Sequence, residues 1–174
     1  MLVAERQREK RAGNMRVRKS LARHIKVLEG ELQQLTDEIG GLIRASPAWR
    51  ETEDLLVSVP GVANKTSSSL LAEVPELGRL TRRRIASLVG VAPYTRQSGR
   101  WKGKSMIAGG RAAARSAVFM AALSASQHNP LLKAFYRRLL AAGKPKMVAL
   151  IAVARKLLVM LNAMIRDKKP WQYA

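Results

Sequence analysis

The stretch LARHIKVLEGELQQLTDEIGGL, residues 21–42, indicates the fold class of this chain. Its apolar residues are separated alternately by four and three positions, the heptad spacing of a helix with one apolar seam. The seam consists of Leu21, Ile25, Leu28, Leu32, Leu35, Ile39 and Leu42. Charged and amide side chains lie between them, and Ser46-Pro47 ends the pattern. We therefore expect a long N-terminal helix of the coiled-coil type.

Two interpretations of this helix remain open. It packs as an amphipathic helix on its own domain, or it is an arm that pairs with another chain or folds back as a hairpin. Three heptads are near the lower limit for a coiled coil. We favour the arm, and with it a homo-oligomer. The basic residues 1–20 show no apolar periodicity, so residues 1–48 are expected to form a basic N-terminus followed by the arm.

The rest of the chain, residues 49–174, is expected to form one compact helical domain. A helix, a tight turn and a second helix are predicted within residues 51–74, and this pattern is similar to a helix-hairpin-helix element. Asn64, Thr66 or Ser67 is the expected cap of the second helix. Further helices are predicted over residues 80–91, 111–127, 130–143 and 144–171. Residues 92–111 are expected to form the loop between the first two of them. No segment has a convincing strand pattern, and the expected fold class is all-α.

The helix boundaries are indicated by particular residues. Thr81 is an expected N-cap, and Gly90 is expected to end the same helix. Asn129-Pro130 has the order of an N-cap followed by proline at the first helical position. Gly143 is expected to end the helix that follows.

Positive charge is the strongest functional signal in the composition. The formal net charge is +20, and residues 77–166 contain eighteen Lys and Arg but no Asp or Glu. Self-repulsion at this level disfavours a compact state unless an anion binds, and nucleic acid is the commonest such partner. A ribosome-associated basic protein has the same composition, but only the charge supports that alternative.

Several classes of protein are excluded or disfavoured by composition. The chain has no cysteine, which excludes disulfides, thiol catalysis and cysteine-bound zinc. Its only histidines are His24 and His128, so a histidine-rich metal site is not expected. Residues 147–165 have the length of a membrane span, but Arg155 and Lys156 lie at their centre, where charges are costly. We expect a core helix, no membrane contact and a cytoplasmic location.

The Pro60-Gly61 turn is the first candidate site. A turn of this kind directs backbone N–H groups outwards beside the positive end of the next helix, where one phosphate can bind without base readout. Gly61 and Lys65 are the candidate contacts. The second glycine of such motifs is replaced by Ala63. A tight helix–helix turn without a ligand is the alternative.

The loop RQSGRWKGKS, residues 96–105, is the second candidate site. Ser98 in this cationic loop is a phosphate contact, a turn residue or a nucleophile, and local chemistry leaves all three open. A serine nucleophile needs a base or a metal, and neither histidine nor carboxylate is near in sequence. Trp101 either stacks on a base or anchors the loop. The candidate phosphate contacts are Arg96, Arg100, Lys102, Lys104, Arg111 and Arg115.

Together these segments resemble the C-terminal domain of one family of insertion-sequence transposases. The ordered motifs are Pro-Gly, Gly-hydrophobic-Ala-Pro, Gln-Ser-Gly, Gly-Gly-Arg, Arg-Ser-Ala and Ala-Gly-Lys-Pro-Lys, and the resemblance covers about residues 17–172. This is the DEDD family, which is related to pilin-gene invertases and includes recombinases guided by a bridge RNA. The order of the motifs is far more specific than any single motif.

The resemblance implies that Ser98 is the catalytic serine, which attacks a DNA phosphodiester and becomes joined to the strand. In that family, metal-binding acidic residues of an N-terminal RNase-H-like domain assist the serine, and the coiled coil assembles protomers so that the two sites meet. That acidic domain is not found in this chain, which would then be truncated, split or degenerate. We expect no metal or cofactor in the chain itself and Mg²⁺ only with the acidic domain.

The predicted function is therefore that of a C-terminal fragment of a DNA transposase or site-specific recombinase. Its expected partners are DNA, a guide RNA if the member is RNA-guided, and further copies of the chain. Whether it is an enzyme by itself is left open, because the acidic domain is missing. The alternative is a non-catalytic module that binds nucleic acid, oligomerises and regulates the full-length transposase.

Overall fold

A computed structural model describes residues 1–95, 97–98, 101–103 and 105–172. The candidate residues Arg96, Arg100 and Lys104 lie outside this part of the chain. The chain divides into two compact units, Met1–Ala45 and Ser46–Ala174. Eight α-helices form nearly all the regular structure in the described residues, so the predicted all-α class is confirmed.

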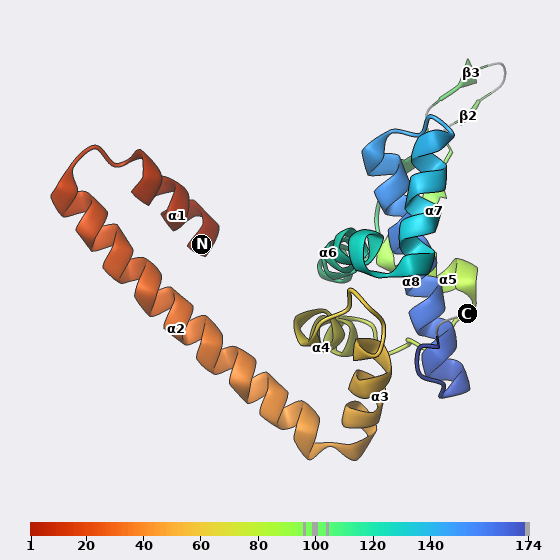
Figure 1. The fold of residues 1–174 in the computed structure, drawn as a ribbon, viewed down its shortest axis with the longest axis horizontal. Coiled ribbons are helices and arrows are strands. Elements are labelled where there is room, and N and C mark those ends of the chain that lie inside the picture. The colour runs from red at the N-terminus through yellow and green to blue at the C-terminus, as the bar shows by residue number, and fades with distance from the viewer. Residues whose placement is uncertain (96, 99–100, 104, 173–174) are drawn as a thin grey trace. The chain divides into compact units, whose positions relative to one another are not determined.

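The smaller unit is a helical hairpin. Helix α2 (Met15–Ala45) is one continuous helix, and α1 (Leu2–Arg11) folds back along it (Figure 1). Arg6 forms an ion pair with Glu29 across the two helices. The seam of α2 is unevenly covered: Ile25 is buried, whereas Leu32, Leu35, Ile39 and Leu42 are exposed. Helix α1 was not predicted, because residues 1–20 carry too few apolar side chains to give a periodic signal.

The larger unit begins with a helix–turn–helix pair. Helix α3 (Pro47–Val57) leads through the Pro60-Gly61 turn into α4 (Asn64–Glu73), and α5 (Arg82–Val89) follows. Thr81 caps α5 by accepting a hydrogen bond from the Arg84 N–H, and Gly90 ends that helix in the left-handed conformation, as predicted.

The N-cap of α4 was predicted wrongly. The residue at that position is Ala63, whose side chain makes no capping hydrogen bond. The nearby hydroxyls bond within the helix pair instead: Ser67 donates to the Asn64 carbonyl and lies 3.1 Å from a Glu53 carboxylate oxygen. A short polar side chain that finds a partner inside its own helix is not available as a cap.

The predicted loop between α5 and α6 is a narrow β-ribbon. Strand β1 (Pro93–Tyr94) pairs antiparallel with β4 (Met106–Ile107), and β2 (Gln97–Ser98) pairs antiparallel with β3 (Trp101–Lys102). The expectation of no strands was therefore wrong in this one segment. Strands of two residues are too short to produce an alternating apolar pattern, so the sequence carries no signal for them.

Three helices complete the larger unit: α6 (Ala112–His128), α7 (Pro130–Ala141) and α8 (Lys146–Asp167) (Figure 1). Helix α6 buries small side chains, among them Ala114, Ala121, Ala122 and Ala125, so its neighbours approach its backbone closely. Asn129 caps α7 with Pro130 at the first helical position, as predicted. Helix α8 is long and apolar enough to cross a membrane by length and composition alone, but eight of its side chains are buried in this unit, in agreement with the predicted core helix.

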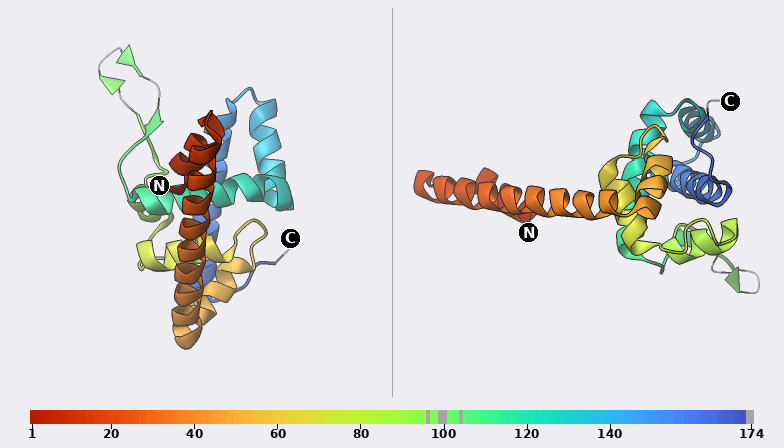
Figure 2. Two further views of the ribbon diagram at one scale, coloured as in Figure 1. Left: turned by 90° about the vertical axis from the view of Figure 1, so that its left-hand side faces the viewer. Right: turned by 90° about the horizontal axis from the view of Figure 1, so that it is seen from below.

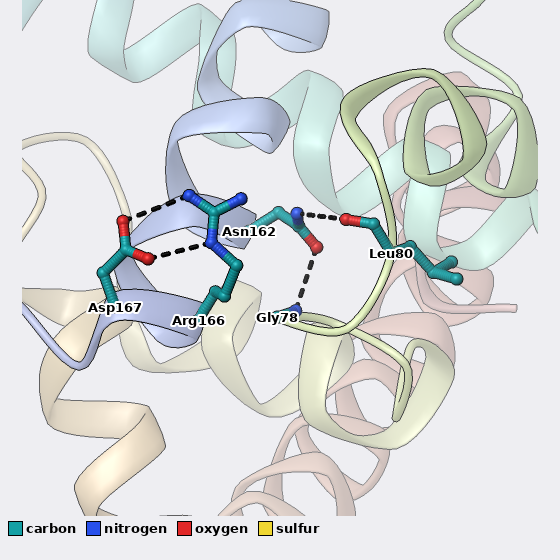
Figure 3. A network of polar contacts seen from close by, with 5 residues as sticks. All are labelled: Gly78, Leu80, Asn162, Arg166 and Asp167. Atoms are coloured by element: carbon teal, nitrogen blue, oxygen red, sulfur yellow. Dashed lines mark hydrogen bonds and ion pairs between the residues drawn. The ribbon is translucent and has the colours of Figure 1, made fainter.

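A buried asparagine of α8 holds the connection between α4 and α5. The Asn162 side-chain oxygen accepts a hydrogen bond from the Gly78 N–H, and its amide nitrogen donates to the Leu80 carbonyl, both at 2.9 Å (Figure 3). A buried amide is costly unless its donors and acceptors are paired, and here it satisfies two backbone groups of an irregular segment. Near the end of the same helix, Arg166 forms an ion pair with Asp167.

Candidate nucleic-acid interface

The Pro60-Gly61 turn packs tightly on α6. Gly61 has a φ of +100°, a backbone conformation that residues with a side chain rarely adopt. A Cβ atom built on Gly61 would lie 2.5 Å from the backbone of Ala125. The glycine is therefore required by the packing of the turn on the helix. A phosphate contact of Gly61 remains a prediction, and close packing explains the residue without one.

The start of α4, which follows this turn, keeps the properties that the phosphate-site prediction needs. Lys65 is exposed in the first helical turn, and no acidic residue lies in that turn. Since no side chain caps the helix, its first backbone N–H groups are left to solvent or to an anion. Lys65 and these N–H groups are together suited to a single phosphate.

Ser98 lies near the tip of the β-ribbon. Its backbone pairs antiparallel with that of Trp101. Lys102 pairs with Gln97 on the neighbouring rung. Nearer the helices, the exposed Tyr94 and Met106 are cross-strand partners, and the Tyr94 hydroxyl lies 3.2 Å from the Ser87 hydroxyl of α5. The ribbon therefore carries the candidate serine away from the helical core.

Arg111, directly before α6, ties the end of the ribbon segment to α4. Its guanidinium donates two hydrogen bonds to the Glu76 carboxylate, at 2.6 and 2.7 Å, and one to the Glu73 carbonyl at 2.8 Å. Its backbone N–H donates to the Leu88 carbonyl of α5. The Arg111 hydrogen bonds lower the pKa of Glu76, and the Glu76 carboxylate raises the pKa of Arg111. The three groups that Arg111 joins lie at the end of α4, in the α4–α5 connection and in α5, so the residue acts here as a clamp.

Two glycines make a second contact at the same place. Gly90, at the end of α5, and Gly110, after the ribbon, approach so closely that a Cβ atom on Gly110 would lie 2.4 Å from the Gly90 nitrogen. The Arg115 guanidinium donates to the carbonyl of Gly109. Both ribbon ends are thus anchored on α5 and α6. Arg111 and Arg115 were predicted as phosphate contacts; the structure gives both of them partners within the chain, and their contact with DNA stays a prediction.

The two candidate sites lie towards opposite ends of α6. Arg115 is in its first turn, whereas Gly61 packs against Ala125 near its other end. Ten residues of α-helix correspond to roughly 15 Å along the axis. The structure therefore brings Arg111 and Arg115 to the ribbon but leaves Gly61 and Lys65 as a separate patch.

Sequence reasoning missed two features of this interface. One is Glu76, which is the last acidic residue before the acid-free segment and the partner of Arg111. The other is the cationic cluster where α7 faces α8, at Arg138 and Lys156. The position of Glu76 at the edge of the acid-free run was a usable signal, whereas the α7–α8 cluster depends on tertiary packing.

The residues present do not form a site for the Mg²⁺ that the resemblance implies. Carboxylates are the charged side chains that hold this hard cation. Within the described ranges, no group of three or more such side chains comes together.

Comparisons with known proteins show which proteins this chain is similar to. The sequence model of the transposase IS116/IS110/IS902 family matches residues 53–137, which include the Pro60-Gly61 turn and the whole ribbon. The pilin gene-inverting protein of Moraxella bovis is 32% identical over 174 residues, covering 98% of this chain and 54% of that protein. The Moraxella lacunata protein of the same name has the same identity and coverage. An uncharacterized 43.6 kDa protein of insertion element IS110 from Streptomyces coelicolor is 31% identical over 150 residues, covering 85% of this chain and 36% of that protein. The chain therefore spans about half the length of the Moraxella relatives.

Proposed function

Since this chain belongs to the IS116/IS110/IS902 family of transposases, we propose that it binds DNA and supplies a serine nucleophile for strand cleavage and joining. It does so as the C-terminal part of a transposase or site-specific recombinase. The proposal is carried by one observation: the family match spans the ribbon on which Ser98 lies near the tip. The charge distribution supports DNA as the partner, because residues 77–166 contain no acidic residue.

The chemistry proposed for Ser98 is attack on a phosphodiester. The serine hydroxyl loses its proton and its oxygen forms a bond to phosphorus, while one phosphorus–oxygen bond of the strand breaks. The departing oxygen takes up a proton and leaves as the free hydroxyl of one strand end, and the phosphate of the other strand end stays joined to the serine. The ribbon presents the serine, and the contacts of Arg111 and Arg115 fix the ribbon on the helices. The acidic residues that assist this serine in the family are proposed to lie in a separate domain.

The proposed assembly uses the seam of α2. Four seam residues, Leu32, Leu35, Ile39 and Leu42, are exposed over about three turns of helix. Apolar side chains at heptad spacing are stabilised when a second helix covers them. We propose that a second copy of the chain does so. A guide RNA remains a prediction from the resemblance.

A strand-joining assay tests the proposed chemistry. The chain is combined with an intact acidic domain of the family, and Ser98→Ala is compared with the unaltered sequence. The variant should abolish joining while DNA affinity changes by less than about twofold, because one neutral hydroxyl contributes little to a phosphate-dominated complex. Unchanged joining by Ser98→Ala would refute the proposed nucleophile.

A second candidate function is regulation by a non-catalytic module. It is favoured by the exposed seam of α2, which could pair with the arm of a full-length transposase. Such a chain would form mixed oligomers with a full-length transposase and inhibit it. Adding the chain to a full-length transposase reaction distinguishes the two: inhibition that Ser98→Ala retains supports regulation, and an increase in joining supports catalysis.

A further inference from the structure

Two cations of the α7–α8 pair converge on one aromatic ring. The Arg138 guanidinium carbon lies 5.3 Å from the centroid of the Phe135 ring, and the Lys156 ammonium nitrogen lies 4.6 Å from the same centroid. With Leu131 and Ala134, these residues line a shallow cavity of about 200 Å³. The face of an aromatic ring attracts a cation, but it cannot neutralise two of them.

No carboxylate compensates this pair in the described part of the chain. Neither Arg138 nor Lys156 takes part in an ion pair there, although other basic residues do. The same two helices and their connection also carry Lys133, Arg137, Lys144, Lys146 and Arg155. Like charges that share one ring and one pair of helices repel each other unless an anion binds near them. The cluster therefore lacks an anionic partner.

We propose that Arg138 and Lys156, held by Phe135, form a binding site for one phosphate of the backbone of duplex DNA. This inference rests on the proposed function for the identity of the nucleic acid. The guanidinium supplies planar paired donors and the ammonium a compact charge, and both suit a phosphate group. The half-exposed Leu131 provides an apolar wall beside the cavity, against which a deoxyribose can pack.

The site is separate from the ribbon and serves a different purpose. In the left view of Figure 2, α7 (cyan) and the ribbon (pale green) lie well apart within the larger unit. Contacts to phosphates fix the register and orientation of a protein on DNA without reading its sequence. The α7–α8 site would therefore hold a second stretch of backbone while the ribbon approaches the strand that reacts.

The test is a titration of labelled duplex DNA over a series of salt concentrations, using the full chain. The double variant Arg138→Gln and Lys156→Gln removes the site. The matched control, Arg23→Gln and Lys26→Gln, removes the same two residue types from exposed positions of α2 that are not on its seam. A third variant, Phe135→Leu, keeps an apolar side chain but removes the ring. Circular dichroism verifies that each variant is folded.

One neutralised phosphate contributes about 0.9 to the slope of log K against log salt. The site variant should therefore lower the slope by about 0.9, with about an eightfold loss of affinity at 0.1 M salt. The control variant should change the slope by less than half as much as the site variant does. Phe135→Leu should lose affinity by an amount between those of the control and the site variant. Equal losses in the site variant and the control would overturn the inference, because only net charge would then matter.

The outcomes also separate this inference from the proposed function. If the site variant and the control have the same affinity and salt slope, but Ser98-dependent strand joining persists, only the proposal of the α7–α8 site is refuted. If the unaltered chain shows no salt slope, the proposed DNA binding itself fails. A duplex RNA of the same sequence is tested as the other possible source of the phosphate. If the unaltered chain binds this RNA more tightly than the DNA, and the site variant loses that difference, the assignment to DNA is overturned.

Discussion

Arg111 has the most partners of any predicted site residue in the described part of the chain. It contacts the Glu76 carboxylate and the Glu73 carbonyl through its side chain and the Leu88 carbonyl through its backbone. A guanidinium whose two terminal nitrogens both donate hydrogen bonds is held in one orientation. At the scale of single residues, the interface thus depends on an arginine whose first function is to position the ribbon.

The Arg111–Glu76 pair predicts a pH dependence of stability. The pKa of Glu76 lies below its ordinary value of 4.5, so the ionised carboxylate stabilises the fold above that value, and this contribution is lost as pH falls through the lowered pKa. Glu76→Gln should lower the melting temperature at neutral pH, and the difference should shrink as pH falls below 4.5. Thermal melts of both proteins at a series of pH values measure this. A difference that stays constant down to the most acidic pH would contradict the assignment.

Gly61 predicts a stability effect that depends on packing. Gly61→Ala places a Cβ atom 2.5 Å from the backbone of α6 at a φ of +100°, so unfolding by urea should show a loss of about 3 kcal/mol or more. Gly143→Ala is the matched control, since Gly143 has φ of +74° but nothing within 4 Å of its Cβ position. It should cost only about 1–2 kcal/mol from backbone strain. Equal losses in the two variants would show that the contact with α6 has no role.

At the scale of elements, the sequence predicted most of the residues that begin or end the helices. Thr81, Gly90 and Asn129-Pro130 act where they were expected, because each depends on local backbone chemistry. The α4 cap was wrong because Ser67 has partners within the α3–α4 pair. The ribbon was missed because its pairing joins residues that no local pattern relates.

The exposed half of the α2 seam gives a prediction about association. Leu35→Lys places a charge in the seam and should weaken self-association of the chain at least tenfold, since the ammonium must lose water when a second helix covers it. Val27→Lys is the matched control on the same helix: Val27 is 57% exposed and Leu35 is 56% exposed, but Val27 is off the seam. Sedimentation equilibrium of both variants measures the effect. A monomeric unaltered chain, or equal weakening by both variants, would contradict the proposed pairing.

At the scale of the whole molecule, the sequence predicted that positive charge is concentrated in one long segment. It did not predict which of these cations pair with groups of the chain itself. The acid-free segment of ninety residues is visible in the sequence and indicated an anionic partner. The sequence could not show that Arg111 forms an ion pair with Glu76. Nor could it show that Arg138 and Lys156 both lie over the Phe135 ring. Those facts depend on helix packing, which joins residues far apart in the chain.

The whole-molecule charge also predicts the behaviour of the complex. Affinity of the full chain for duplex DNA should fall steeply with salt, with a slope of several units, because each phosphate contact releases about 0.9 counterion. Fluorescence anisotropy over a salt series measures the slope. Heparin, which is also polyanionic, should compete; a slope near zero would mean that phosphates are not the main contacts.

The covalent protein–DNA adduct is the direct product of a serine nucleophile and can be detected. The chain, an acidic domain of the family, Mg²⁺ and end-labelled DNA are mixed, and the protein–DNA product is digested and mapped by mass spectrometry. We expect a nucleotide attached to the Ser98 oxygen and no adduct in Ser98→Ala. An adduct attached to any other residue, or the same amount of adduct in Ser98→Ala, would contradict it.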